Sequence, residues 1–161
     1  MIMRVYHQFG PFYKKDSKIL ILGSFPSVKS REVCFYYSHP QNRFWKVLAG
    51  VFEEEVPVTL DEKKSFLIQH QIALWDVIES CEIQGSSDAS IRNAEPTDLA
   101  GLMQHTSIEK ILINGKTAYQ HYRKKQNHLE VQTVCLPSTS PANAVWSLEN
   151  LIKAYQEELK V

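Results

Sequence analysis

Four short aliphatic runs alternate with segments of helical periodicity, and this alternation constrains the fold more than any other feature of the sequence. The runs are SKILILG (17–23), IALWDVI (72–78), EKILING (109–115) and VQTVCL (131–136). The first has apolar residues on both faces of the expected strand, which is typical of a strand buried in a parallel sheet. The order predicts the fold class α/β, as a single-domain three-layer α/β/α structure with a central, mostly parallel four-stranded sheet flanked by helices.

Apolar residues at helical spacing lie between these runs. The clearest stripe repeats at i, i+3, i+4, i+7 and i+8 and consists of Phe44, Val47, Leu48, Val51 and Phe52. Further helices are expected over 58–71, where the Asp61 carboxylate would cap the first turn, and over 97–104, 116–122 and 148–159. The polar, turn-rich segment 79–96 is expected to be a long loop.

The length of 161 residues fits one domain, expected to span residues 1–161. Eighteen basic and eighteen acidic residues cancel, which argues against a protein that coats nucleic acid by bulk charge. The sum conceals opposed segments, because residues 1–46 hold eight basic and two acidic side chains whereas residues 47–101 hold three and eleven. A local basic surface therefore remains compatible with the composition.

The three cysteines, Cys34, Cys81 and Cys135, form no CxxC pair, which argues against a disulfide framework, a zinc site and an iron–sulfur cluster. No apolar run approaches the about 18 residues that a membrane helix needs, and the N-terminal residues lack the hydrophobic segment of a signal peptide. We expect a cytoplasmic monomer without membrane contact.

Polar residues follow each predicted strand, at the edge where sheets of this class bind ligands. The segments are GSFPSVKS (23–30), DVIESCEIQGSSDASIRN (76–93), NGK (114–116) and PSTSPAN (137–143). The first comes close to a phosphate-binding loop, but Val28 replaces its second glycine and Pro26 removes a backbone donor. These departures argue against a nucleotide hydrolase.

The segment YYSHPQNRFW (36–45) crowds aromatic rings beside amide and guanidinium donors, a combination that suits a flat heterocycle. A structural interpretation accounts for part of it: His39 and Pro40 as a rigid turn, Asn42 as a helix N-cap, and the last two aromatics as core.

Five segments, in this order, resemble the uracil-DNA glycosylase superfamily, most closely its hypoxanthine-DNA (deoxyinosine) branch and next the mismatch-specific uracil/thymine glycosylases. They are LGSFPSVKS, YYSHPQNRFWKVL, ALWDVIESCEIQGSSDASIRN, INGKTAY and LPSTSPANA. The resemblance implies a monofunctional DNA glycosylase that flips deaminated bases, hypoxanthine first, out of double-stranded DNA. It would hydrolyse the N-glycosidic bond without a metal or cofactor and leave an abasic site for base excision repair.

The resemblance also implies site residues. Ser24, Phe25 and Pro26 stand where most of the superfamily has a water-activating Asn or Asp. The resemblance to the hypoxanthine branch implies that Asn42 is the catalytic residue, whose amide would orient water and contact the sugar or base. Tyr37 would stack on the base. The implied base pocket is Ser24, Phe25, Tyr37, Asp76 and Asn114. The implied DNA contacts are Lys29, Arg31, Arg43, Lys46, Lys116, Ser138, Thr139 and Ser140.

Several alternatives stay open at this stage. Asp76 fits a loop or helix cap equally well, residues 138–140 fit an ordinary turn, and Asp88 and Asn93 fit loop-fixing hydrogen bonds. The protein as a whole fits a uracil/thymine mismatch-specific glycosylase, a non-catalytic module that binds damaged DNA, or a hydrolase of free nucleosides or nucleotides.

Overall fold

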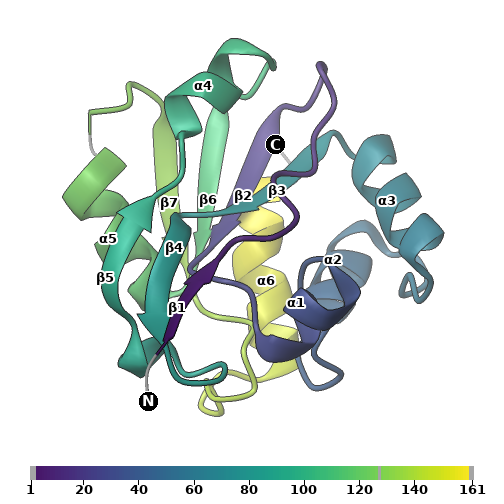
Figure 1. Cartoon of the computed structure of the whole chain (residues 1–161). Coiled ribbons are helices and arrows are strands. Elements are labelled where there is room, and N and C mark those ends of the chain that lie inside the picture. The colour runs from purple at the N-terminus through teal and green to yellow at the C-terminus, as the bar shows by residue number, and fades with distance from the viewer. Residues whose placement is uncertain (1–2, 127, 160–161) are drawn as a thin grey trace.

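The four predicted strands form one parallel sheet, in the order β3-β2-β6-β7, in the computed structural model, which describes residues 3–126 and 128–159 (Figure 1). The strands are β2 (Ile19–Gly23), β3 (Ile72–Asp76), β6 (Lys110–Asn114) and β7 (Gln132–Leu136). Because all four run the same way, their carboxyl ends lie at one edge of the sheet. The predicted fold class is confirmed.

Helices cover both sides of this sheet. In Figure 1, α5 (Lys116–Gln126) lies on the left of the sheet, α2 (Phe44–Phe52) and α3 (Leu60–Gln69) lie on the right, and α6 (Leu148–Leu159) lies in the lower centre. The first packs against β6 and β7, α3 against β3, and α2 against α6. Two further helices are short: α1 (Val28–Val33) follows β2, and α4 (Leu99–Gln104) precedes β6.

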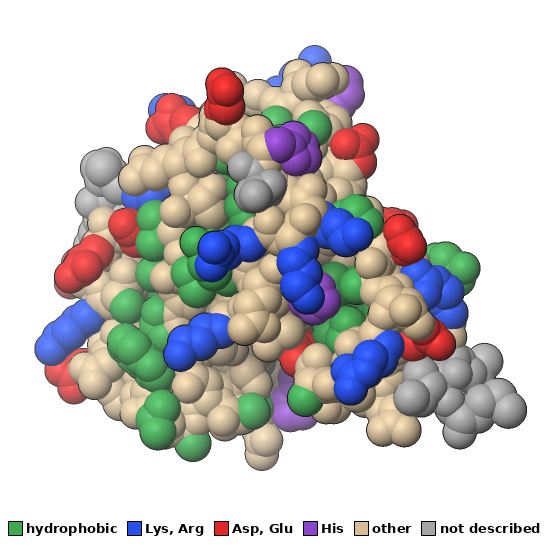
Figure 2. All heavy atoms as spheres, turned by 90° about the vertical axis from the view of Figure 1, so that its left-hand side faces the viewer, with side chains coloured by type: hydrophobic (Ala, Val, Ile, Leu, Met, Phe, Trp, Pro, Cys, Tyr) green, Lys and Arg blue, Asp and Glu red, His purple; other side chains and the backbone are tan. Residues whose placement is uncertain are grey.

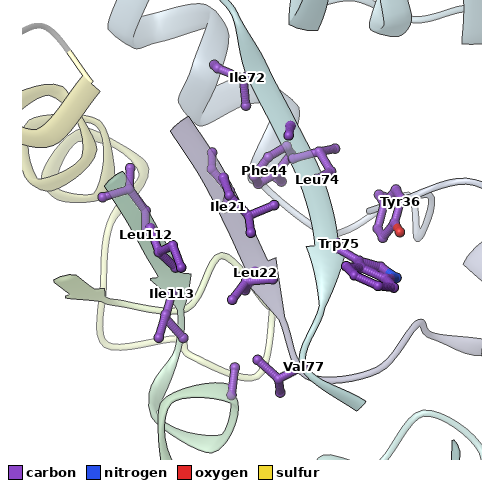
Figure 3. Packing of buried hydrophobic residues seen from close by; sticks show 14 of the residues in the cluster. Ile21, Leu22, Tyr36, Phe44, Ile72, Leu74, Trp75, Val77, Leu112 and Ile113 are labelled. Carbon is purple, nitrogen blue, oxygen red and sulfur yellow. The ribbon is translucent and has the colours of Figure 1, made fainter. Parts of the chain in front are cut away.

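The core lies between the sheet and its helices. Ile21 and Leu22 of β2 are flanked by Leu112 and Ile113 of β6 on one side and by residues of β3 on the other (Figure 3). These side chains are buried because central parallel strands have a covered face on each side. The α2 stripe predicted from spacing also faces inward, with only Phe52 in part exposed.

A second, three-stranded antiparallel sheet corrects the expectation of a long loop. It has the order β1-β4-β5 and is built from β1 (Met3–Tyr6), β4 (Ile78–Ile83) and β5 (Arg92–Pro96), with a 3₁₀ turn, η1 (Asp88–Ser90), before the last strand. Most β5 residues are exposed, so this strand carries no apolar alternation. Its pairing with β4, rather than any local pattern, makes it a strand.

Two helix starts also differ from expectation. Thr59, not Asp61, caps α3: its hydroxyl accepts from the Glu62 N–H at 3.1 Å, while the Glu62 carboxylate accepts from the Thr59 N–H at 2.8 Å. This reciprocal capping box leaves Asp61 in the first turn. Asn42 lies one residue before the N-cap of α2, which is Arg43.

Within residues 3–126 and 128–159, no helix is long and apolar enough to cross a membrane. The same residues contain no group of three or more His, Cys, Asp or Glu side chains placed to hold a metal ion.

Candidate functional site

The segments that follow the four parallel strands meet at the carboxyl edge of the sheet, together with residues 36–43, which precede α2. Asn42 from that segment contacts Thr139 after β7, which in turn contacts Asn114 at the end of β6. Residues far apart in the sequence thus form one polar cluster at the edge where the sequence predicted chemistry.

Thr139 links the two asparagines through a chain of hydrogen bonds. Its hydroxyl accepts from Asn114 Nδ2 at 3.0 Å and donates to Asn42 Oδ1 at 2.8 Å, and its backbone N–H donates to Asn114 Oδ1 at 3.0 Å. Thr139 is 0% exposed. The predicted phosphate contact therefore does not fit Thr139, which instead holds Asn42 from inside the protein.

The hydrogen bonds of Asn42 determine which end of its amide is free. Its Oδ1 accepts from the backbone N–H of Phe44 at 2.9 Å as well as from Thr139. Since a backbone N–H can only donate, the oxygen must face it, and both of its lone pairs are used. Nδ2 has no hydrogen bond to the described residues, so Asn42 presents a fixed N–H donor.

Arg43 fastens the loop of residues 137–147 to the start of α2. Its backbone N–H donates to the Thr139 carbonyl at 3.1 Å. Its guanidinium donates to the carbonyls of Ser140 at 3.1 Å, Asn143 at 3.0 Å and Trp146. Three of the five guanidinium donors thus point to carbonyls of the protein, and a phosphate contact of Arg43 stays a prediction.

Tyr37 lies beside the asparagine cluster in a constrained conformation. Its ring stacks on Phe44, with centroids 3.8 Å apart and planes 15° from parallel. Its φ of 52° lies in the left-handed region, which is uncommon for an aromatic residue, and Trp45 Nε1 donates to its carbonyl at 3.2 Å. Burial raises the pKa of Tyr37, and the charge of Asp76 raises it further, against a smaller opposite effect of Asn114. The phenol therefore stays protonated.

Gly23 allows Tyr37 and Asp76 to approach the end of β2. Gly23 and Asp76 are partners in the parallel register, and a Cβ on Gly23 would lie 2.6 Å from Asp76 Oδ1 and 3.2 Å from the Tyr37 hydroxyl. The first distance is shorter than any normal contact. Only glycine leaves both side chains where they are.

We therefore expect Gly23→Ala to displace Asp76 and to lower the free energy of unfolding by about 1–3 kcal/mol, the usual cost of overpacking. Urea unfolding measures the change. Ala73→Gly in β3, which removes a methyl group and creates no clash, is a second variant with which the change in the free energy of unfolding is compared. A Gly23→Ala variant as stable as the wild-type protein would show that Asp76 moves without cost.

Two carboxylates approach the site from different sides. Asp76 at the end of β3 is buried and pairs with His7, whose Nε2 lies 2.8 Å from its Oδ2. Asp88 in η1 accepts from the Ser24 hydroxyl, with both oxygens at 3.0 Å. Burial raises the pKa of Asp88, the Ser24 bond lowers it, and the nearby Asp76 charge raises it. Ser24 thus connects the first predicted loop to a residue whose role the sequence left open.

The remaining predicted DNA contacts divide into two groups. Lys29, Lys46 and Lys116 are exposed, and Lys29 lies 4.0 Å from Glu32. Arg31 is more occupied, because it donates to the Gly85 carbonyl at 2.6 Å and its guanidinium lies 5.7 Å from the centre of the buried Phe25 ring.

Ser138 and Ser140 make hydrogen bonds within their own loop. Their hydroxyls accept from the backbone N–H groups of Ser140 and Ala142, at 3.1 and 3.2 Å. These bonds are those of an ordinary serine-rich turn, which was the alternative interpretation of the segment.

Basic side chains also gather outside the predicted contacts. Figure 2 shows the face over α5 and β5, where Lys and Arg side chains spread across the middle and acidic ones lie mostly toward the margins. The last turn of α5 contributes Arg123, Lys124 and Lys125.

Sequence reasoning missed two residues that support the site. His7 lies outside every motif, and only the antiparallel pairing of β1 brings it to Asp76. Tyr155 of α6 is fully buried and donates to the Pro137 carbonyl at 2.9 Å, at the start of the loop 137–147. Tyr155 lies in the helix predicted over 148–159, although its hydrogen bond to the loop could not be predicted.

Comparisons with known proteins assign the chain to a family. The sequence model of the Uracil DNA glycosylase superfamily matches residues 11–160. A protein of Methanosarcina acetivorans named hypoxanthine DNA glycosylase is 34% identical over 141 residues, which cover 86% of this chain and 89% of the relative. A protein of the same name from Methanosarcina barkeri is 30% identical over 137 residues, covering 84% and 86%.

A solved structure shows the same fold. It is a solution NMR structure of a candidate uracil DNA glycosylase from Methanosarcina acetivorans, with a TM-score of 0.79 and 29% sequence identity. The match covers 95% of this chain and 97% of that one.

Proposed function

The chain belongs to the uracil DNA glycosylase superfamily, and we propose that it is a monofunctional DNA glycosylase that releases deaminated bases, hypoxanthine first, from double-stranded DNA. Two relatives that align over most of their length carry the name hypoxanthine DNA glycosylase. The single observation that carries the proposal is the fixed amide of Asn42, which presents a free N–H donor beside Tyr37 at the carboxyl edge of the sheet.

The reaction needs charge stabilisation more than it needs a strong base. As the glycosidic bond breaks, positive charge develops on the sugar and negative charge on the departing base, so a fixed donor that faces the base lowers the barrier. We infer that Asn42 Nδ2 donates to the base as it leaves. Because Oδ1 is already saturated, we assign to Nδ2 the contact with the base that the sequence predicted for this amide.

The ring of Tyr37 offers a stacking surface for the flipped base. Phe44 covers one face of its ring at 3.8 Å and keeps the ring from turning. The opposite face is then the one on which a purine would stack, which is worth about 1–3 kcal/mol per base. A neutral phenol adds no negative charge that would oppose the departing base.

Asp76 is proposed to recognise the edge of the base. Deamination turns the ring nitrogen of adenine or cytosine from an acceptor into an N–H donor, as in hypoxanthine and uracil. A carboxylate oxygen accepts from that N–H and repels the lone pair of the parent base. The same oxygen thus accounts for a shared preference for deaminated bases over adenine and cytosine.

The exposed lysines are proposed to meet the DNA backbone. Lys29, Lys46 and Lys116 are exposed side chains on or beside the loops after β2 and β6 and at the start of α2. Each phosphate contact should add about 0.9 to the slope of log affinity against log salt concentration. The monomeric state and the cytoplasmic location stay predictions.

Incubation with duplexes that carry one deoxyinosine, deoxyuridine, deoxyxanthosine or G·T mismatch, followed by alkali, tests the function. We expect release from the deoxyinosine duplex to be fastest, with strand breaks only after alkali, as for a monofunctional enzyme. Faster release of uracil or of mismatched thymine would favour the alternative glycosylase. Binding to the deoxyinosine duplex without base release would favour a damage-binding module, and release from free deoxyinosine would favour a nucleoside hydrolase.

A further inference from the structure

His7 is a buried polar residue for which the proposed reaction has so far no use. It follows β1, and its backbone N–H donates to the Glu79 carbonyl of β4 at 2.7 Å. Its side chain is 1% exposed. Three rings surround the imidazole, with centroids 4.7 to 6.1 Å away, and belong to Phe9, Phe25 and Tyr36. A polar ring in such an apolar cage is costly to bury unless it makes a specific hydrogen bond.

That hydrogen bond goes to Asp76. His7 Nε2 lies 2.8 Å from Asp76 Oδ2, and the Asp76 side chain is 5% exposed. Among the described residues, no other side chain donates to this carboxylate. His7 is therefore the side chain that holds this carboxylate in one orientation.

The two oxygens of Asp76 have different surroundings. Oδ2 faces His7, whereas Oδ1 lies over the end of β2. A Cβ added to Gly23 would lie 2.6 Å from Oδ1 and 3.2 Å from the Tyr37 hydroxyl. Oδ1 accepts no hydrogen bond from the described residues. Holding Oδ2 therefore fixes the direction in which Oδ1 points, which is toward the proposed base site.

We propose that His7 is a positioning residue that keeps Asp76 turned so that Oδ1 accepts the ring N–H of a deaminated base. This inference rests on the proposed function. An oxygen held in this direction accepts from the N–H of hypoxanthine and meets the lone pair of adenine, so the orientation of the carboxylate carries the discrimination. The second sheet then has a functional purpose, because its strand β1 brings His7 to the site.

The choice between hypoxanthine and adenine distinguishes this role from a purely structural one. A variant that only loosens the fold lowers the affinity for a deoxyinosine duplex and for the matching deoxyadenosine duplex alike. A variant that lets Asp76 turn lowers the ratio of the two affinities, because Oδ1 no longer faces the edge of the base.

The test compares His7→Phe with His7→Gln in single-turnover release of hypoxanthine and in the ratio of the affinities for a deoxyinosine duplex and the matching deoxyadenosine duplex. His7→Phe keeps a ring but no donor, and we expect a loss of rate of about tenfold or more together with a smaller affinity ratio. His7→Gln keeps an N–H donor and should recover most of the rate and the wild-type ratio. His70→Phe is the matched control, because His70 also pairs with a carboxylate, Glu54 at 2.6 Å, but at the opposite end of β3.

Each outcome decides the proposal. Equal losses of rate in both His7 variants with an unchanged affinity ratio would overturn it and leave His7 a structural residue. Wild-type rates and ratios in both would overturn it as well. If His7→Phe does not fold, His7→Gln still decides, because a wild-type rate and ratio there are the expected rescue and a smaller ratio contradicts it. Absence of base release in the wild-type protein would instead overturn the proposed function itself.

Discussion

Replacing Asn42 by Asp is expected to remove base release as completely as replacing it by Ala, with a loss of about 10²- to 10³-fold for each variant. The carboxylate of Asn42→Asp can still accept from the Phe44 N–H and the Thr139 hydroxyl, so the bonds that hold the side chain survive. What disappears is the free N–H donor, and a negative oxygen takes its place. That oxygen repels the negative charge that develops on the departing base. Single-turnover release of hypoxanthine from a deoxyinosine duplex measures the loss.

The same pair of variants decides between two roles for residue 42. If Asn42 acted by accepting a proton or a hydrogen bond from water, a carboxylate would serve as well or better, and Asn42→Asp would retain or exceed the wild-type rate. Thr139→Val and Thr139→Ser supply the control. The valine variant removes the hydroxyl that orients Asn42, whereas the serine variant keeps it, so only the first should slow release.

The parallel sheet could be predicted from the sequence because its signal is local. Burial on both faces requires continuous aliphatic runs, and Leu20 to Leu22 are completely buried in the strand that such a run predicted. β5 shows the opposite case. Its residues are mostly exposed, and it is a strand only because β4 pairs with it, which no local pattern reports.

The sequence predicted where the candidate site lies, but not the contacts of each side chain. The small polar residues after each strand marked the carboxyl edge of the sheet, and Asn42, Tyr37 and Asn114 lie together there. Whether a polar side chain faces the solvent or the protein depends on contacts formed by distant segments. Charge alone therefore favoured a phosphate contact for Arg43, although the nearest acceptors are carbonyls of the loop after β7.

Arg43→Ala is accordingly expected to destabilise the protein by about 2–4 kcal/mol, because hydrogen bonds to charged groups contribute more than neutral ones and several carbonyls lose their donor together. Base release should fall as well, since the loop that Arg43 holds carries Thr139, which orients Asn42. Arg43→Lys should recover little of either, because one ammonium group cannot match the planar guanidinium that bridges three carbonyls. Urea unfolding with an unchanged slope against denaturant measures the first effect.

The salt dependence of DNA binding separates this internal role from a phosphate contact. Arg43→Ala should weaken catalysis while the slope of log affinity against log salt concentration stays at the wild-type value. Lys46→Ala, a change at an exposed residue three positions away, should reduce that slope by about 0.9 and leave stability nearly unchanged. A reduced slope in Arg43→Ala, with the free energy of unfolding unaltered, would instead show that Arg43 contacts a phosphate, as its charge predicted.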